Sequence, residues 1–362
     1  MHVPGGQLRE RVCVCVCACE KREMCDFAGS TQWRFWLFGE GQGDEIGREK
    51  LLECRLGANH RAQERLLQLQ QRRKEAGSSS GEGKKKDRDI SRYFLQPEDE
   101  LLLEQFFASR IRALAEHLEL PVHVEATAIT FFKRFFLRNS FMEHDPVKIT
   151  MASLYLACKA EENYLSVRDF LQLFSKATNE TISVEDILLQ EMTLLEGIGF
   201  HLQIHHPFRF LRAFRVKDSQ HTIPSEVWNE AHNFLRNSLT MDAQFLYTPL
   251  EIATASMHDT LQNMGVNTLD SVLPEAAALG ESRLRAVAAS MRNTIQDLEA
   301  KQRSVGKSFR RIQKLVAPLL EFDVVTKQQE ADRKRHEKLQ ERSERERLED
   351  AETLGMPLQE LK

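Results

Sequence analysis

The sequence lacks long hydrophobic runs and an excess of charge of one sign. No apolar stretch approaches the ~18 residues that a membrane-spanning helix needs, and the N-terminus has no signal-peptide core. The 362 residues include 50 Lys and Arg against 54 Asp and Glu, which gives a net charge of −4. We therefore expect a soluble, intracellular protein with no membrane and no nucleic acid as direct partner, because nucleic-acid-binding domains are usually basic.

The sequence also lacks the motifs of catalytic, cofactor and metal sites. It has no glycine-rich phosphate loop, no nucleophile elbow and no paired cysteines at zinc-ligand spacing. Four of its seven cysteines alternate with small residues from Cys13 to Cys19, and we interpret residues 1–28 as a low-complexity or misassigned segment. His205 and His206 have no matching Cys or carboxylate set and are more typical of the start of a helix. We expect no catalytic residue, no cofactor and no metal, and therefore no enzyme activity in this chain alone.

What the sequence does contain is helical periodicity, without the alternation that would indicate a sheet. Pro97 and the acidic residues after it start a first helix, Asp145 caps a third and Ser183 caps a fifth. The third helix is apolar nearly all round, so it belongs in the middle of a bundle. The expected helices are 97–118, 123–139, one from 146, 167–174 and 183–196, and then 207–216, one after 224, one from 249, 269–273 and 281–298. We predict an all-α fold.

A repeated pentapeptide divides this helical region into two. Phe-Leu-Arg-Asn-Ser occurs at 136–140 and at 234–238, and each copy is followed by a capped proline, Asp145-Pro146 or Thr248-Pro249. The repeat of roughly 100 residues is too long for a solenoid unit, so each copy should be a small domain with its own core. We place the first unit at 90–203 and the second at 204–300, and the loop between the second and third helices is longer in the second unit.

Charged segments flank the two units. Residues 29–89 should hold one amphipathic helix, Glu49 to Glu75, with a possible interruption at Gly57, and a solvated linker from Gly77 to Lys86. A further helix is expected at 301–322. The mixed charges of 323–362 suit either an exposed single helix or a disordered tail.

Two tandem five-helix units with a buried third helix resemble the cyclin fold. The run from Tyr155 to Glu162, Tyr-Leu-Ala-Cys-Lys-Ala-Glu-Glu, is similar to the third-helix motif of cyclin boxes. Phe131 to Phe136 and Asp242 to Pro249 are more similar to the cyclin H branch than to others, and cell-cycle cyclins usually carry Asp at the position of Lys133. The resemblance covers about Ser30 to Leu320.

The resemblance implies a function as well as a fold. It implies tandem cyclin boxes with additional N- and C-terminal helices, and Lys159, Glu162 and Glu191 as kinase-binding residues. The implied partners are a cyclin-dependent kinase of the CDK-activating type, its RING-type assembly factor and the core of transcription factor IIH. That kinase would phosphorylate kinase activation loops and the C-terminal domain of RNA polymerase II, and the protein would be nuclear. Arg110 to Leu114 only partly match the substrate-docking motif of cell-cycle cyclins, so no such groove is expected.

Three alternatives stay open at this stage. On periodicity alone, Lys159 would merely complement a helix C-terminus and Glu191 would be a solvated surface side chain, each contributing under ~1 kcal/mol. A cyclin C-like transcriptional cyclin fits Lys133 and Arg134 as well. A DNA-binding general factor of the transcription-factor-IIB type shares the fold, but it predicts a zinc ribbon and a basic surface.

Overall fold

Helices make up the protein throughout the residues that the structure describes. The computed structural model describes residues 36–38, 44–78, 89–178, 182–218, 222–266, 279–292 and 298–353. Within these ranges it contains α-helices and one short 3-10 helix, η2 (Ser91–Tyr93), and no strand. The predicted all-α fold is confirmed. The segment 1–28 and the expected element at 269–273 lie outside the described residues.

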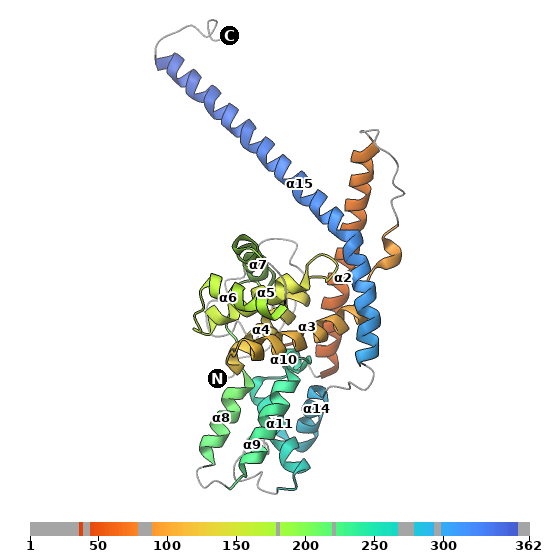
Figure 1. Ribbon diagram of the computed structural model, residues 1–362, viewed down its shortest axis with the longest axis vertical. Coiled ribbons are helices and arrows are strands. Elements are labelled where there is room, and N and C mark those ends of the chain that lie inside the picture. The colour runs from red at the N-terminus through yellow and green to blue at the C-terminus, as the bar shows by residue number, and fades with distance from the viewer. Residues whose placement is uncertain are drawn as a thin grey trace, which may run out of the picture.

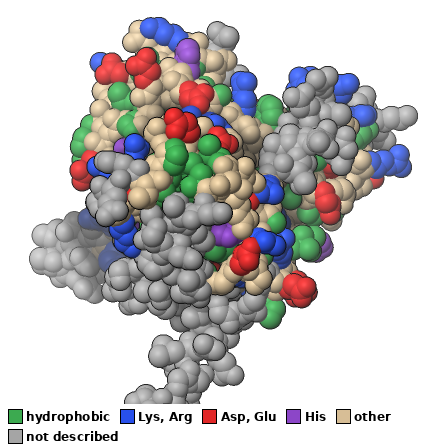
Figure 2. Space-filling view, turned by 90° about the horizontal axis from the view of Figure 1, so that it is seen from below, with side chains coloured by type: hydrophobic (Ala, Val, Ile, Leu, Met, Phe, Trp, Pro, Cys, Tyr) green, Lys and Arg blue, Asp and Glu red, His purple; other side chains and the backbone are tan. Residues whose placement is uncertain are grey.

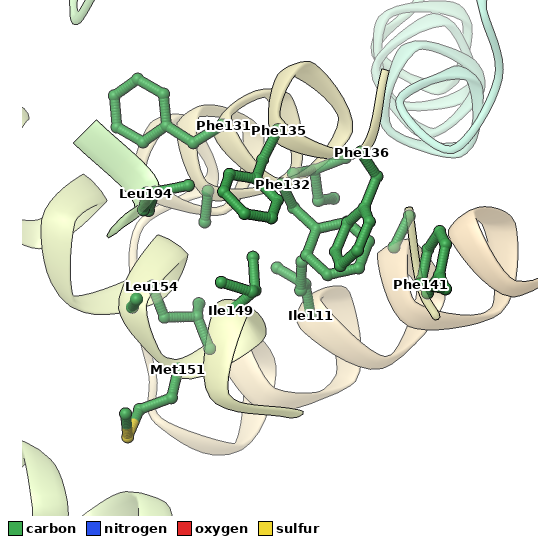
Figure 3. Packing of buried hydrophobic residues seen from close by; sticks show 14 of the residues in the cluster. Ile111, Phe131, Phe132, Phe135, Phe136, Phe141, Ile149, Met151, Leu154 and Leu194 are labelled. Atoms are coloured by element: carbon green, nitrogen blue, oxygen red, sulfur yellow. The ribbon is translucent and has the colours of Figure 1, made fainter. Parts of the chain in front are cut away.

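The first unit consists of five helices around a buried central one. They are α3 (Pro97–His117), α4 (Val122–Phe136), α5 (Pro146–Ala160), α6 (Val167–Thr178) and α7 (Val184–Gly197). Two predicted caps are present: the side chain of Asp145 accepts a hydrogen bond from the backbone N–H of Val147, and Ser183 accepts one from Asp186. Every residue of α5 from Ile149 to Cys158 is buried, which confirms the central position predicted for the third helix. Figure 3 shows α4 phenylalanines converging with Ile149 and Leu154 of α5.

The second unit repeats this plan around α11. Its helices are α8 (Pro207–Lys217), α9 (Ser225–Ser238), α10 (Ala243–Leu246), α11 (Pro249–Asn263) and α14 (Glu281–Met291). Helix α11 starts at the predicted capping box of Thr248 and Glu251 and packs against α8, α9 and α14. Helix α10 was not predicted; it occupies the longer loop of this unit. The prediction that the last helix of the unit extends to Leu298 is wrong, because the backbone of Arg292 is extended and Leu298 begins the next helix.

Each unit has its own hydrophobic core, and the two units lie end to end (Figure 1). The flanking helices α2 (Asp44–Ser78) and α15 (Leu298–Thr353) both pack on the first unit. They contribute buried side chains to its core, from α2 Leu51, Leu66 and Leu69 and from α15 Phe309, Ile312, Val316 and Leu319. The core of the first unit is therefore completed by segments from both ends of the chain.

Helix α2 is longer than the sequence predicts, since it continues through Gly57 without a break and reaches Ser78. Helix α15 runs past residue 322 into the charged segment as far as Thr353, so that the helix, one of the two forms left open for this segment, is the one present there. Pro318 lies inside α15, where proline removes one backbone hydrogen bond and bends a helix. Figure 1 shows α15 changing direction where it leaves the body of the molecule.

Two observations bear on a membrane or nucleic-acid partner: the apolar length of the described helices and the charge pattern on the face drawn in Figure 2. None of the described helices is both long enough and apolar enough to cross a membrane. On the face seen in Figure 2, the end of the molecule formed by the second unit, Lys and Arg side chains are interspersed with Asp and Glu. This face does not carry the uniformly basic field that DNA binding by a transcription-factor-IIB type of protein would need.

Candidate functional site

The structure brings together two of the three predicted site residues. Lys159 lies in the last turn of α5 and Glu191 in the middle of α7, and their side chains form an ion pair. Glu191 is only 7% exposed, whereas the Lys159 side chain is 38% exposed. The carboxylate is thus fixed in the packed interior and the ammonium reaches the surface. Glu191 is not the solvated side chain that periodicity alone would allow.

An aromatic ring supports the same lysine. The Nζ atom of Lys159 lies 4.7 Å from the centre of the Tyr155 ring, one turn earlier in α5. A cation over an aromatic face is stabilised by about 0.5–1 kcal/mol at a partly exposed site. Burial, and then the nearby carboxylate of Glu191, raise the pKa of the Tyr155 hydroxyl, which stays protonated at neutral pH. Lys159 is therefore held in one orientation by a carboxylate and a ring.

Glu162, the third predicted residue, lies apart from this pair. It follows the end of α5 with a left-handed φ of +58°, a conformation that costs a non-glycine residue free energy. Its backbone N–H donates to the carbonyl of Lys159 at 3.3 Å. The side chain is exposed and has no hydrogen-bonding or ionic partner among the described residues. Glu162 thus presents an exposed carboxylate just beyond the C-terminal end of α5, apart from the Lys159–Glu191 pair.

Helix α7 also exposes apolar side chains next to Glu191. Leu188, Leu189 and Met192 are 48%, 62% and 50% exposed, while Ile187 of the same helix is fully buried. Exposed apolar side chains that cluster on one helix mark a surface that binds another protein. We call Lys159, Glu191 and these three apolar residues the α7 surface.

The sequence carries a signal for exposed apolar side chains on α7, because Ile187, Leu188 and Leu189 are consecutive and a single face of a helix cannot bury three consecutive side chains. Of this run only Ile187 is buried against the first core, as is Leu194 one turn after Glu191.

A buried ion network fixes the second unit and α2 against the first unit. Lys133 of α4 is 0% exposed, and its Nζ lies 3.2 Å from a carboxylate oxygen of Glu104 in α3 and 3.2 Å from one of Asp242 before α10. Arg55 of α2 donates to both carboxylates, at 2.8 Å to Asp242 and 3.3 Å to Glu104. Burial alone would raise the pKa of Asp242, but Lys133 and Arg55 outweigh it and hold this pKa well below its usual value.

Lys133 also donates hydrogen bonds to backbone carbonyl groups of the second unit. Its ammonium donates to the carbonyls of Thr240 at 3.0 Å and Met241 at 2.6 Å. From the sequence, Lys133 was noted only as a residue that differs from the Asp of cell-cycle cyclins, and its role in joining the two units was not predicted. A second link comes from the repeated pentapeptide, since Arg236 of α9 donates from Nε to Glu125 of α4 at 3.0 Å, and Glu125 is 1% exposed. These contacts hold the second unit against α4, the helix on which α7 packs.

The described residues form no catalytic or metal-binding arrangement. No group of three or more potential metal ligands occurs among them. His206 is the N-cap residue of α8, as expected for the start of a helix, and burial, with a smaller effect of Arg134, lowers its pKa to about 3. Burial likewise raises the pKa of the Cys158 thiol to about 11, which leaves it a core residue without nucleophilic character.

Known proteins are similar to this chain in sequence. The family described as "Cyclin, N-terminal domain" matches residues 88–203. Cyclin mcs2 of Schizosaccharomyces pombe is 31% identical over 245 residues, which cover 65% of this chain and 69% of that protein. Cyclin-H of Xenopus laevis is 28% identical over 265 residues, covering 71% and 75% of the two chains. Cyclin CCL1 of Saccharomyces cerevisiae is 31% identical over 265 residues; the match covers 70% of this chain and spans 62% of that relative.

A solved structure supports the fold. The chain is similar to one from a CAK complex of Chaetomium thermophilum bound to ATP-gamma-S, with a TM-score of 0.60 and 24% identity, over 83% of this chain and 93% of that one. The protein belongs to the cyclin family, whose members are non-catalytic regulators of kinases. Within this family it is similar to a cyclin-H and to the mcs2 and CCL1 cyclins. These matches do not support the alternative of a transcription-factor-IIB type of protein.

Proposed function

We propose that this cyclin binds and activates a cyclin-dependent kinase of the CDK-activating type, and that the α7 surface contacts the kinase. The observation that carries the proposal is the Lys159–Glu191 ion pair, which is rooted in the core and flanked by exposed Leu188, Leu189 and Met192. An ion pair of this kind orients donors toward polar backbone groups of a partner helix. The apolar side chains beside it supply the buried area that a stable interface requires.

The mechanism is the positioning of one kinase helix. A protein kinase is active only when the Glu of its C-helix reaches the strand Lys that holds the ATP phosphates. A rigid helical platform that binds the C-helix in the inward position shifts the kinase toward that state. Lys159 and Glu191 would contact the kinase directly, and Glu162 would meet a basic or N–H group at the edge of the interface. Catalysis then belongs entirely to the kinase.

The proposal also covers the substrates of the kinase complex, its third subunit and its location. The related chain from Chaetomium thermophilum is part of a CAK complex, and the Xenopus relative is a cyclin H. By analogy, the substrates would be kinase activation loops and the C-terminal domain of RNA polymerase II, within transcription factor IIH and in the nucleus. A RING-type assembly factor would be the third subunit.

A pull-down with the tagged full chain, followed by mass spectrometry, tests this proposal. We expect a CDK-activating kinase and a RING-type factor to be recovered together, and the eluate to phosphorylate both an activation-loop peptide and a polymerase heptad-repeat peptide. A matched bait with Leu189→Asp and Met192→Asp should lose the kinase. Recovery of a cyclin C-type kinase with neither activity would contradict the proposal and favour the cyclin C alternative.

A further inference from the structure

A small cavity lies between the two units, next to the side chains of Thr130 and Arg134 of α4. Its volume is about 50 Å³. Its walls come from α4, from the segment before α8, from α10 and α11, and from the short N-terminal segment at Leu37. The backbone N–H of Phe38 donates to the carbonyl of Phe245 at 2.7 Å, which fixes that segment against α10. We call this space the inter-unit cavity.

Arg134 lines the cavity as a buried cation without a counter-ion. The residue is 4% exposed, and neither Asp nor Glu pairs with it among the described residues. One of its N–H groups donates to the carbonyl of His201 at 3.0 Å, and the guanidinium lies 5.1 Å from the Trp36 ring. Its Nε–H is buried and has no acceptor in the part of the chain that the structure describes. An isolated buried charge costs several kcal/mol, so this guanidinium strongly favours an anion beside it.

A second residue with an unsatisfied donor lines the same cavity. Gln244 of α10 accepts a hydrogen bond from Thr130 at 2.8 Å through its carbonyl oxygen, while its buried amide nitrogen has no partner among the described residues. Pro207, at the first position of α8, also lines the cavity, and this helix start has no side-chain cap. The positive end of the α8 dipole therefore adds to the field of Arg134.

The groups that could cancel this field are already engaged. The side chain of Glu161 accepts from Thr127 at 2.6 Å, and Thr127 in turn lies 2.7 Å from Nε2 of His206. The C-terminal end of α9 borders the cavity as well, but the carbonyls of Thr240 and Met241 beyond it bind Lys133. Burial lowers the pKa of Arg134 to about 9, because no carboxylate among the described residues is close enough to offset the loss of hydration.

Size and wall chemistry specify the anion. A volume of about 50 Å³ holds a few atoms and excludes a nucleotide. One guanidinium and one amide match a singly charged planar carboxylate better than a phosphate dianion. The remaining walls include the apolar side chains of Leu37, Leu239 and Ile252, which suit a short aliphatic stem.

We propose that the inter-unit cavity binds the side-chain carboxylate of a glutamate from an extended segment of a partner protein, with Arg134 as its counter-ion and the Gln244 amide as a second donor. The partner segment would lie across the boundary between the two units and insert one side chain. This site is separate from the α7 surface, and its test needs no kinase. Failure of either proposal therefore leaves the other standing.

Thermal unfolding of the full chain with N-acetylglutamate amide, at constant ionic strength, tests the site. At about tenfold above its Kd this probe should raise Tm by about 2 °C, and the neutral N-acetylglutamine amide should not. Sodium acetate should act more weakly, because it lacks the stem, and inorganic phosphate should have no effect. Equal shifts with the glutamine compound, or larger shifts with acetate or phosphate, would overturn the assignment to a glutamate side chain.

Variants localise the effect. Arg134→Met should abolish the Tm shift and Gln244→Met should reduce it, whereas Arg138→Met should retain it in full. Arg138 is the matched control because it lies over the same Trp36 ring, at 4.6 Å, but does not line the cavity. If Arg134→Met does not fold, the Nε–H resonance of Arg134 in the unmodified protein gives the answer. A shift of that resonance with the glutamate probe alone supports the proposal, and an unchanged resonance overturns it.

Discussion

Gly197, the last residue of α7, lies directly against the ring of Phe135 in α4. A methyl group at this position would come within 2.4 Å of Cδ2 of Phe135, whose side chain is almost fully buried. The absence of a side chain at Gly197 therefore permits the close packing of α7 on α4. The same helix carries Glu191, so this contact also sets the position of the α7 surface.

Gly197→Ala should destabilise the protein by about 2 kcal/mol, because overpacking a close-packed core forces side chains from their rotamers. The matched control is Gly306→Ala in α15, where the added methyl group meets no atom within 4 Å. That change should stabilise the helix by about 0.5–1 kcal/mol. Urea unfolding of both variants measures the difference. Equal stability of the two variants would contradict the packing described for α7.

The two copies of the pentapeptide show how far context decides the role of a residue. Arg138 of the first copy lies over the ring of Trp36, while Arg236 of the second copy pairs with Glu125 across the units. The identical pentapeptides thus have different tertiary partners, and they also end their helices differently, since α4 ends at Phe136 and α9 continues to Ser238. The repeat could predict the duplicated fold, and it could not predict which copy links the units.

At the scale of elements, the network of Lys133, Glu104, Asp242 and Arg55 joins four segments of the chain. The pKa of Asp242 in this network is lower in the folded protein than in the unfolded chain. The ionised Asp242 therefore stabilises the fold above the ordinary aspartate pKa of about 4, and this stabilisation is lost as the pH falls below it. Asp242→Ala should cost about 3 kcal/mol at pH 7, because it leaves the two buried cations Lys133 and Arg55 with a single carboxylate, that of Glu104. The difference from the unmodified protein should shrink below pH 4 in denaturant titrations. A difference that stays constant with pH would contradict this assignment.

Helix α15 has two parts with different structural roles. Phe309, Ile312 and Leu319 are buried in the first core, whereas residues 328–343 are exposed at every position. Ending the chain after Lys327 should therefore change Tm by less than about 1 °C, because exposed residues contribute little to stability. Ending it at residue 297 should unfold the first unit, since each buried apolar side chain contributes about 1.5–3 kcal/mol. Calorimetry of the two truncated chains distinguishes these outcomes, and a large loss in the longer chain would show that the projecting part is structural.

At the scale of the whole molecule, sequence predicted what is local and missed what is tertiary. The caps at Asp145, Ser183 and Thr248 and the buried third helix follow from short-range patterns, and all are present. The packing of α2 and α15 on the first unit could not be predicted, because an amphipathic helix fits any apolar surface of the right shape. Helix α10 is too short to leave a periodic signal.

The candidate site was predictable only in part, for the same reason. Lys159 and Glu191 are 32 residues apart and meet only because α5 packs against α7, so their pairing came from the family resemblance and not from periodicity. Lys133 carried a signal, since a lysine inside a run of phenylalanines must find buried partners. Arg134, its neighbour, carried the same signal, but the lack of a counter-ion depends on elements far away in the chain.

The affinity of the chain for its purified kinase, measured by calorimetry, tests the central claim most directly. Lys159→Ala with Glu191→Ala should weaken binding about 30-fold, which corresponds to about 2 kcal/mol. The matched control is Lys148→Ala with Asp186→Ala, which removes an exposed ion pair of 3.5 Å between the same two helices. This control should bind within about twofold of the unmodified protein, since exposed pairs contribute little. Unchanged kinase binding and activation by the Lys159 and Glu191 double variant, with its helical content intact, would contradict the account.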